Sequence, residues 1–307
     1  MAREGVPYGP VALVGSGEYL DVMLDVDRSL LADRPQRAVF LATAAAEEGE
    51  ASVRRWLDLG TRHFERLGVE PVPLPVLTRE DAAREDLAAL VAGAGLVYLS
   101  GGNPGYLAST LRGTLVWTAI AAAWRSGTAL AGCSAGACAL SYVAEDVRAA
   151  RRRAAGLEGT AGGRGAAGAG PAAEKDIGAA APAERAARQP SGLAAVAEVA
   201  VIPHYNRMIE WVPDFAERLA AGLPESVTIL GIDEDTAVTT FDPPSLGRRR
   251  FSVAGRQAAW VIDRDGSRTP YEVGSTFELG LRVAADGRSG GAGSGDRRQA
   301  RSAGDLG

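Results

Sequence analysis

The sequence predicts an α/β protein built on an open, doubly wound and mostly parallel β-sheet with helices on both faces. Short apolar runs end in glycine or polar residues, which is typical of buried parallel strands. Helical patterns lie between several of these runs, as parallel strand connections require. The chain has 307 residues, of which 46% are hydrophobic, so it can bury a sheet of this kind.

Five apolar runs are the predicted strands of this sheet, and they alternate with three helical patterns. The strands are expected at 10–17, 38–44, 95–102, 128–133 and 199–204, and the helices at 47–67, 79–91 and 106–125, the last broken near Gly113. Two later runs, 227–241 and 251–263, predict added C-terminal strands that close the sheet or form a hairpin on it.

Two segments differ sharply in composition from the rest of the chain. The stretch 149–191 is dominated by Ala, Gly, Arg and Pro, and the tail 284–307 is similar. Such segments bury too little apolar surface to offset the entropy of ordering, so we expect a flexible insertion and a disordered tail. The sequence therefore predicts a single α/β domain over 1–283 that carries this insertion.

Charge and cysteine content limit the classes of function. The net charge of −5 and the pI of about 5.3 argue against nucleic acid as a partner. No apolar run approaches the roughly 20 residues of a membrane span, and the N-terminus lacks the apolar core of a signal peptide. The two cysteines, Cys133 and Cys138, fit neither a metal-ligand spacing nor a disulfide framework. We expect a cytoplasmic protein without a metal or cofactor, and the sequence leaves a homodimer open.

The stretch "GTALAGCSAGACAL" (127–140) carries the strongest functional signal. Ser134 is flanked by Gly132 and Gly136 in the G-x-S-x-G pattern, which is typical of a nucleophilic serine at a sharp strand-to-helix turn. Cys133 is a rival nucleophile, but side chains alternate along a strand end, so Cys133 should point away from Ser134 into the core. The sequence therefore predicts Ser134 as the nucleophile.

A serine nucleophile needs a base, and the chain has two histidines. His63 lies mid-helix beside charged residues and is predicted to be a surface residue. His204 follows an apolar strand and is the candidate base. Glu145, followed by Asp146, is the favoured orienting acid because both come soon after the turn at Ser134. The acids of the insertion lack a fixed position, and Glu198 lies at the end of its strand away from His204.

The loop "SGGNPGY" (100–106) is a candidate oxyanion hole, although taken alone it is equally typical of an ordinary strand-to-helix turn. Two consecutive glycines precede a helix start, and their exposed N–H groups could bind a developing oxyanion together with the N–H of Ala135. Asn103 in this loop and Arg207 behind the candidate base are the predicted substrate-binding residues. Arg207 either binds a substrate carboxylate or is an ordinary surface arginine. The stretch "GSGE" at 15–18 lacks the third glycine of a dinucleotide-binding fingerprint, so it is a weak nucleotide signal.

Five segments in order carry a resemblance to a known family: "LVGSGE", "LVYLSGGNPGYLASTLR", "LAGCSAGACAL", "VIPHYNR" and "LGIDEDTAV". Together they resemble the aspartyl dipeptidase (dipeptidase E) and cyanophycinase family of serine peptidases, whose fold is similar to that of class I glutamine amidotransferases. The resemblance implies Ser134 as nucleophile, His204 as base and an oxyanion hole from the backbone of Gly102 and Ala135. It also implies a cofactor-free hydrolase of small peptides or isopeptide bonds, often with an aspartyl group.

The chain departs from that family pattern at three places. Relatives commonly have a glutamate early in the helix after the nucleophile, where this chain has Ser141 and Tyr142. Many have an aspartate two residues after the histidine, where this chain has Asn206, which could orient His204 through its amide. The loop at Gly102 lacks the glutamine of the cyanophycin-degrading branch, which argues against cyanophycin as substrate.

Several functions remain compatible with these residues. The leading hypothesis is a serine peptidase that hydrolyses small peptides, among them aspartyl dipeptides, through an acyl-enzyme on Ser134. The departures motivate a second hypothesis, a catalytically silent protein that binds a ligand or a partner on the same scaffold. An α/β-hydrolase esterase shares G-x-S-x-G but usually has its histidine near the C-terminus. Glutamine amidotransfer is disfavoured because serine, not cysteine, stands between the two glycines.

Overall fold

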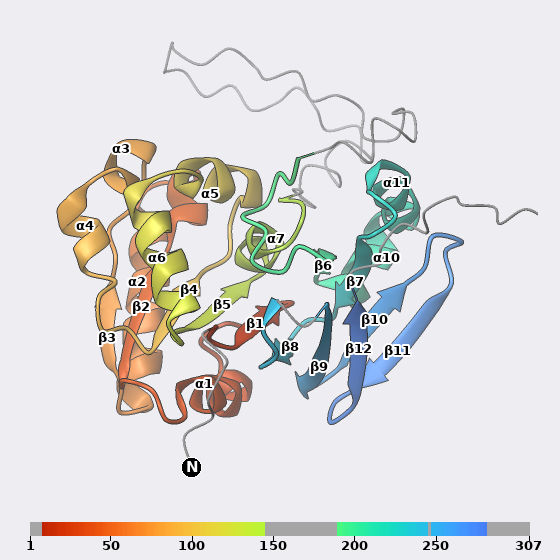
Figure 1. The fold of residues 1–307 in the computed structure, drawn as a ribbon, viewed down its shortest axis with the longest axis horizontal. Coiled ribbons are helices and arrows are strands. Elements are labelled where there is room, and N and C mark those ends of the chain that lie inside the picture. The colour runs from red at the N-terminus through yellow and green to blue at the C-terminus, as the bar shows by residue number, and fades with distance from the viewer. Residues whose placement is uncertain (1–7, 145–188, 245–246, 281–307) are drawn as a thin grey trace, which may run out of the picture.

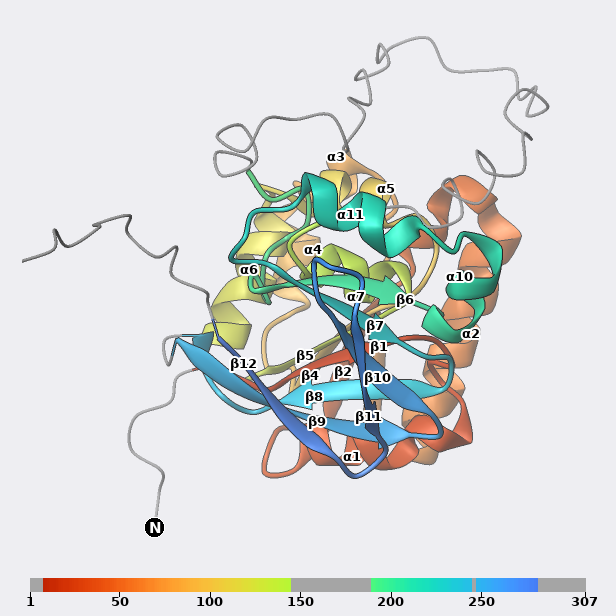
Figure 2. The same ribbon diagram turned by 90° about the vertical axis from the view of Figure 1, so that its right-hand side faces the viewer.

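The computed structural model describes residues 8–144, 189–244 and 247–280, which form two β-sheets flanked by helices (Figures 1 and 2). The first sheet has eight strands in the order β12-β9-β8-β1-β5-β4-β2-β3. Its strands are β1 (Val11–Val14), β2 (Arg37–Leu41), β3 (Glu70–Pro73), β4 (Leu96–Leu99), β5 (Ala129–Cys133), β8 (Thr236–Thr240), β9 (Arg248–Gly255) and β12 (Thr276–Gly280). In this order, neighbouring strands of the set β1-β5-β4-β2-β3 pair in parallel. The pairings that involve β8, β9 and β12 are antiparallel.

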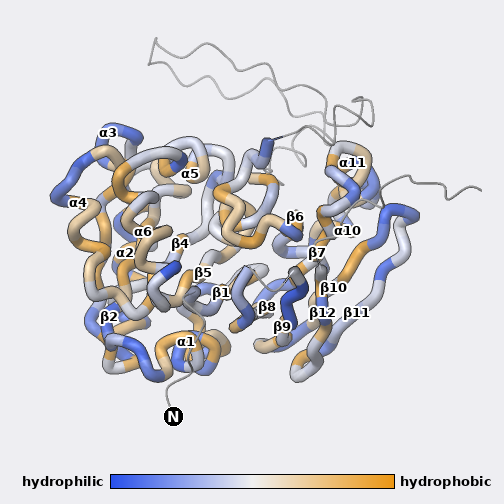
Figure 3. Tube along the Cα trace, in the orientation of Figure 1, coloured by the Kyte–Doolittle hydropathy of each residue, from blue (hydrophilic) through white to orange (hydrophobic). Residues whose placement is uncertain are grey.

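Helices cover both faces of this sheet, which confirms the predicted α/β architecture. They are η1 (Asp21–Met23), α1 (Leu24–Leu31), η2 (Thr43–Glu48), α2 (Glu50–Arg66), α3 (Arg79–Ala82), α4 (Glu85–Ala89), α5 (Pro104–Leu111), α6 (Leu115–Arg125) and α7 (Ala135–Leu140). Phe40 packs with α1 and α2, while its neighbours Val39 and Leu41 pack with α4 to α7 on the opposite face. On α1, Val26, Leu30 and Leu31 are buried, while Asp25, Arg28 and Ser29 are exposed, so one side of this helix faces the core. Figure 3 shows both hydrophobic and hydrophilic residues along this helix.

The second sheet has four strands in the order β11-β10-β7-β6. They are β6 (Val199–Pro203), β7 (Thr228–Ile232), β10 (Ala258–Ile262) and β11 (Arg268–Glu272). Helices α10 (Tyr205–Trp211) and α11 (Phe215–Gly222) pack against β6 and β7. The strand before His204 therefore lies in this second sheet. The sequence-based expectation that it belongs to the first sheet was wrong.

The two sheets share a hydrophobic core. One cluster of buried residues contains Val201 and Leu230 from the second sheet together with Val238 and Phe251 from the first. The carboxyl ends of β5 and β6 lie close to one another, since Ser134 and His204, the residues that follow them, are in contact. This arrangement brings the strand ends that carry the candidate site residues together.

Some elements differ from the sequence-based expectation. The short edge strand β3 was missed because Pro71 and Pro73 interrupt it, and proline is confined to such edges. The helix expected at 79–91 is two short helices, α3 and α4. The predicted insertion at 149–191 lies outside the described residues except for its last three, and the tail 284–307 lies wholly outside them. No helix in the described part of the chain is long and apolar enough to cross a membrane.

Candidate active site

Ser134 occupies a strained turn between β5 and α7. Its backbone has φ 51° and ψ −109°, a conformation that costs free energy for a residue other than glycine. The Ser134 N–H donates to the carbonyl of Val14 at 2.8 Å. The flanking glycines are needed for close packing: a Cβ on Gly132 would lie 2.5 Å from backbone atoms of Gly136. A Cβ on Gly136 would lie 2.1 Å from the carbonyl oxygen of Leu99.

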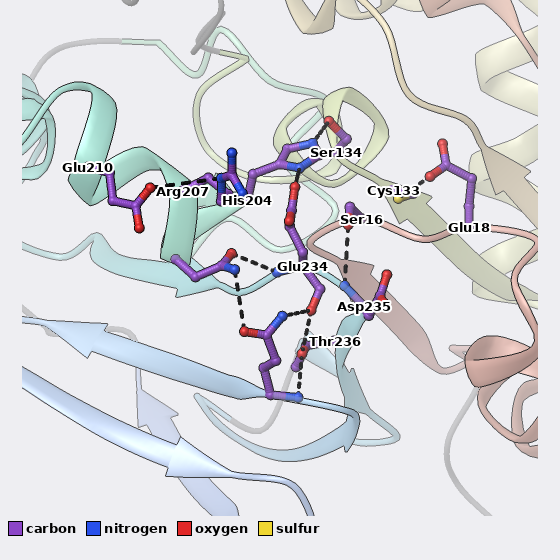
Figure 4. A network of polar contacts seen from close by, with 12 residues as sticks. Ser16, Glu18, Cys133, Ser134, His204, Arg207, Glu210, Glu234, Asp235 and Thr236 are labelled. Atoms are coloured by element: carbon purple, nitrogen blue, oxygen red, sulfur yellow. Dashed lines mark hydrogen bonds and ion pairs between the residues drawn. The ribbon is translucent and has the colours of Figure 1, made fainter.

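His204 approaches Ser134 from the second sheet. It follows β6 in the left-handed conformation (φ 50°, ψ 37°) and precedes α10. Its Nε2 lies 3.0 Å from Ser134 Oγ (Figure 4). Its side chain is 27% exposed. The other ring nitrogen, Nδ1, lies 3.1 Å from Glu234 Oε1. Because an ionised carboxylate only accepts hydrogen bonds, Nδ1 carries the hydrogen and Nε2 accepts from the serine hydroxyl.

Glu234 is the acid that the sequence analysis did not identify. It lies in the connection between β7 and β8, where the chain crosses from the second sheet to the first. The expected acid Glu145 and its alternative Asp146 lie outside the described residues. The acids predicted from the sequence all lie between Ser134 and His204, whereas Glu234 follows His204 and stands in the "LGIDEDTAV" segment that contributed to the family resemblance. That segment was the available signal.

Asn206 binds the main chain of Glu234 and, within the described part of the chain, makes no hydrogen bond to the His204 ring, so the orienting role expected for its amide was wrong. Its Oδ1 accepts from the Glu234 N–H at 3.0 Å, and its Nδ2 donates to Gln257 Oε1 at 3.3 Å. Gln257 Nε2 in turn donates to the Glu234 carbonyl at 2.9 Å. The side chains of Asn206 and Gln257, which also bind each other, thus hold both the N–H and the C=O of Glu234. Asn206 positions the acid, and through it the histidine.

The loop at 100–103 leaves one amide unbound beside Ser134. The N–H of Gly101 donates to Glu18 Oε1 at 2.9 Å, and that of Asn103 donates to the Ala44 carbonyl at 2.7 Å. Gly102 has φ 143°, and a Cβ there would lie 2.1 Å from the Ala44 carbonyl oxygen. Among the described residues, its N–H has no hydrogen-bond acceptor. The N–H of Ala135, the first residue of α7, likewise has no acceptor within its helix.

Cys133 lies in the core, as the sequence predicts. Its side chain is fully buried, and its Sγ–H donates to Glu18 Oε2 at 2.7 Å. Burial and the neighbouring Glu18 carboxylate raise the pKa of the Cys133 thiol well above its usual range. Because the thiolate is the nucleophilic form, this protonated and enclosed thiol is a poor rival to Ser134.

The two predicted substrate-binding residues border these groups. Asn103 caps α5 by accepting from the Tyr106 N–H at 3.1 Å and donates to Glu47 Oε2 at 2.7 Å. Arg207 lies one turn along α10 from His204, is half-exposed, and has its guanidinium 5.4 Å from the Trp211 ring centroid.

His63 is buried, so its predicted surface location was wrong. It is 1% exposed, and its Nε2 lies 2.7 Å from Asp27 Oδ2. Its ring packs against Tyr19 and Phe64. Charged neighbours along the sequence suggested an exposed position, but the buried Asp27 comes from another helix and gives His63 a polar partner in the core. Within the described residues, no group of three or more His, Cys, Asp or Glu side chains could hold a metal ion.

Comparison with known proteins supports the family resemblance. A model of peptidase family S51 matches residues 11–152. The crystal structure of a peptidase from an acI-B1 Actinobacterium is 31% identical, with a TM-score of 0.67, and the match covers 88% of this chain and 96% of that one. A putative peptidase E from Listeria monocytogenes EGD-e is 17% identical over 76% of this chain and 94% of its own, with a TM-score of 0.44. No curated protein matches the sequence. The chain belongs to peptidase family S51, a family of serine peptidases.

Proposed function

We propose that this protein hydrolyses small peptides through an acyl-enzyme on Ser134. The observation that carries the proposal is the continuous contact from Ser134 Oγ through His204 to Glu234. In the first half-reaction, Oγ attacks the peptide carbonyl while His204 Nε2 takes its proton. The imidazolium that forms is stabilised by the Glu234 carboxylate, and its proton passes to the leaving amine. A water molecule, deprotonated by the same nitrogen, then hydrolyses the ester.

The N–H groups of Gly102 and Ala135 are the proposed oxyanion donors. The neighbouring amides of Gly101 and Asn103 are occupied by Glu18 and Ala44, so Gly102 is the donor that this loop offers. Donors that are fixed before the reaction do not have to reorganise as charge develops on the carbonyl oxygen. The close approach of the loop to the nucleophile supports this assignment: a Cβ on Gly101 would lie only 3.4 Å from Ser134 Cβ.

Aspartyl dipeptides are the proposed substrates, with Arg207 as the residue that binds a substrate carboxylate. Its Nε lies 3.9 Å from Glu210 Oε2, which is too long for a hydrogen bond, and its side chain is 51% exposed. A guanidinium in this state can form a bidentate pair with an incoming carboxylate. Asn103 would contact the substrate backbone near the oxyanion hole. The free thiols of Cys133 and Cys138 support a reducing, cytoplasmic setting.

The catalytically silent alternative is less well supported. It rested on the missing early glutamate and on Asn206 in place of aspartate. Glu234 supplies a carboxylate to His204, and Asn206 holds Glu234 in place. Both departures therefore have a compensating contact, and the peptidase is favoured.

The test is hydrolysis of dipeptides with N-terminal Asp, Glu, Gly or Ala, together with labelling by a fluorophosphonate probe. We expect cleavage and labelling by the wild type, with preference for Asp, and a loss of about 10⁴-fold or more in Ser134→Ala. Ser29→Ala, an exposed serine on α1, is the matched control and should behave as the wild type. If the wild type neither cleaves nor labels above Ser134→Ala, the silent alternative replaces the peptidase.

A further inference from the structure

We propose that Glu18 is a positioning residue that sets the distance between the oxyanion loop and the nucleophile. Resting on the proposed function, this inference assigns a role to a buried carboxylate that the reaction itself does not use. Glu18 follows β1 and is 7% exposed. Its two oxygens bind two segments far away in sequence, the Gly101 N–H at 2.9 Å and the Cys133 Sγ–H at 2.7 Å.

Both partners are the immediate neighbours of groups that the reaction needs. Gly101 precedes Gly102, the proposed oxyanion donor, and Cys133 precedes Ser134. One carboxylate therefore joins the loop to the strand end. After Gly102, the loop is held again by the bond from the Asn103 N–H to the Ala44 carbonyl. Gly102 is thus fixed on both sides, with its own N–H left for the substrate.

The turn that carries Glu18 is shaped for this task. Gly17 and Tyr19 both have positive φ, 84° and 67°, and the second value is costly for a residue other than glycine. In this conformation the Tyr19 hydroxyl lies 2.7 Å from Ser100 Oγ. Two consecutive side chains therefore bind two consecutive residues of the oxyanion loop. A strained turn that makes these contacts favours a positioning role over simple core packing.

A carboxylate suits this place better than an amide. Both partners, the Gly101 N–H and the Cys133 S–H, are donors, and an ionised carboxylate offers an acceptor to each. The raised pKa of Cys133 keeps the thiol protonated and hence a donor. Glutamine could accept from one partner, but its NH₂ group would face the other one. Serine at position 133 would keep a donor, whereas alanine would remove it.

The experiment compares second-order rates of labelling by a fluorophosphonate, together with thermal unfolding midpoints, for Glu18→Ala, Glu18→Gln, Cys133→Ala and Cys133→Ser. We expect Glu18→Ala to label about 100-fold more slowly, as when an oxyanion donor is lost. Cys133→Ala should lose about 10-fold, and Cys133→Ser should recover most of that loss because its hydroxyl can donate to Glu18. Glu18→Gln should fall between the wild type and Glu18→Ala.

Asp27→Asn is the matched control, since Asp27 is also a buried carboxylate but binds His63. It should lower the unfolding midpoint while labelling at the wild-type rate. The proposal is overturned if folded Glu18→Ala labels like the wild type, or if Asp27→Asn slows labelling equally. Should Glu18→Ala fail to fold, the two Cys133 variants decide, and equal rates for them overturn it. A wild type that labels no faster than Ser134→Ala overturns the proposed function itself, a result distinct from these.

Discussion

Three side chains in contact determine the chemistry of this site, and the least expected of them is Glu234. A histidine between a serine hydroxyl and a carboxylate is held in the tautomer that can accept the serine proton. Glu234 makes this contact with a side chain that is 36% exposed, so it needs support from its surroundings. That support comes from Asn206 and Gln257, which bind the N–H and C=O of Glu234.

Replacement of Glu234 by glutamine tests this assignment. Gln can present its NH₂ to Nδ1 and stabilise the wrong tautomer, so we expect kcat to fall by about 10³- to 10⁴-fold. Because the side chain is partly exposed, the unfolding midpoint should change little. Steady-state dipeptide hydrolysis and thermal unfolding measure the two effects. Glu225→Gln, an exposed acid between α11 and β7, should retain wild-type kcat; a Glu234→Gln enzyme with wild-type kcat would remove Glu234 from the mechanism.

The sequence could identify Ser134 and His204 as candidates but not the acid. The glycines around Ser134 are a local signal, since the turn itself requires them. The chain has two histidines, so only these two side chains were candidates for a histidine base. Glu234, in contrast, lies 30 residues after His204 in the sequence, in the connection between the two sheets. The "LGIDEDTAV" segment contains Glu234, but nothing within it specifies the contact with His204. No local pattern indicates the burial of His63 against Asp27 either.

At the level of elements, the connection from β5 to α7 serves two purposes. It packs α7 against the sheet, and it positions Ser134 and the Ala135 N–H. Gly136 is the second residue of α7, and its Cα lies against the Leu99 carbonyl of β4. The helix can start directly after the nucleophile only because no side chain separates it from that strand. The helix start in turn places the Ala135 N–H beside Ser134.

Gly136→Ala should therefore damage both stability and function. The new Cβ would lie 2.1 Å from the Leu99 oxygen, so α7 must shift; we expect a loss of about 2–4 kcal/mol in unfolding free energy. Fluorophosphonate labelling of the folded fraction should also slow. Gly105→Ala is the matched control, because Gly105 is the second residue of α5 and its Cβ would have neighbours no closer than 3.5 Å. It should be neutral or slightly stabilising; equal losses in urea unfolding would contradict this view.

Apolar runs predicted the strands β1, β2, β4, β5 and β6, but they could not assign β6 to its sheet. A buried strand has the same pattern in either sheet, and the difference lies in its partner: β6 pairs with β7, with Val199 opposite Thr228 further along the chain. The edge strand β3 gave no apolar signal because Pro71 and Pro73 occupy half of it. Tertiary pairing, which the sequence alone does not specify, decided both cases.

At the level of the whole molecule, the site is assembled across two sheets. Ser134 comes from the first sheet, His204 from the second, and Glu234 from the chain that connects them. The relative position of the sheets therefore affects catalysis directly. An ion pair also links them: Arg249 on β9 of the first sheet forms a bidentate contact with Glu198, which precedes β6 of the second. Both side chains are buried, with 3% and 7% exposure.

Disruption of this pair should show how strongly the two sheets are joined. Removal of one partner leaves a buried, unpaired charge, so Arg249→Met and Glu198→Met should each lose about 3–5 kcal/mol of unfolding free energy. The double variant should recover most of that loss, since two apolar side chains of similar volume replace the pair without leaving a charge. Arg28→Met, which breaks the exposed pair with Asp25, should change stability by less than about 1 kcal/mol. Urea unfolding distinguishes the outcomes: if the losses of the two single variants simply add in the double variant, the pair is not what joins the sheets.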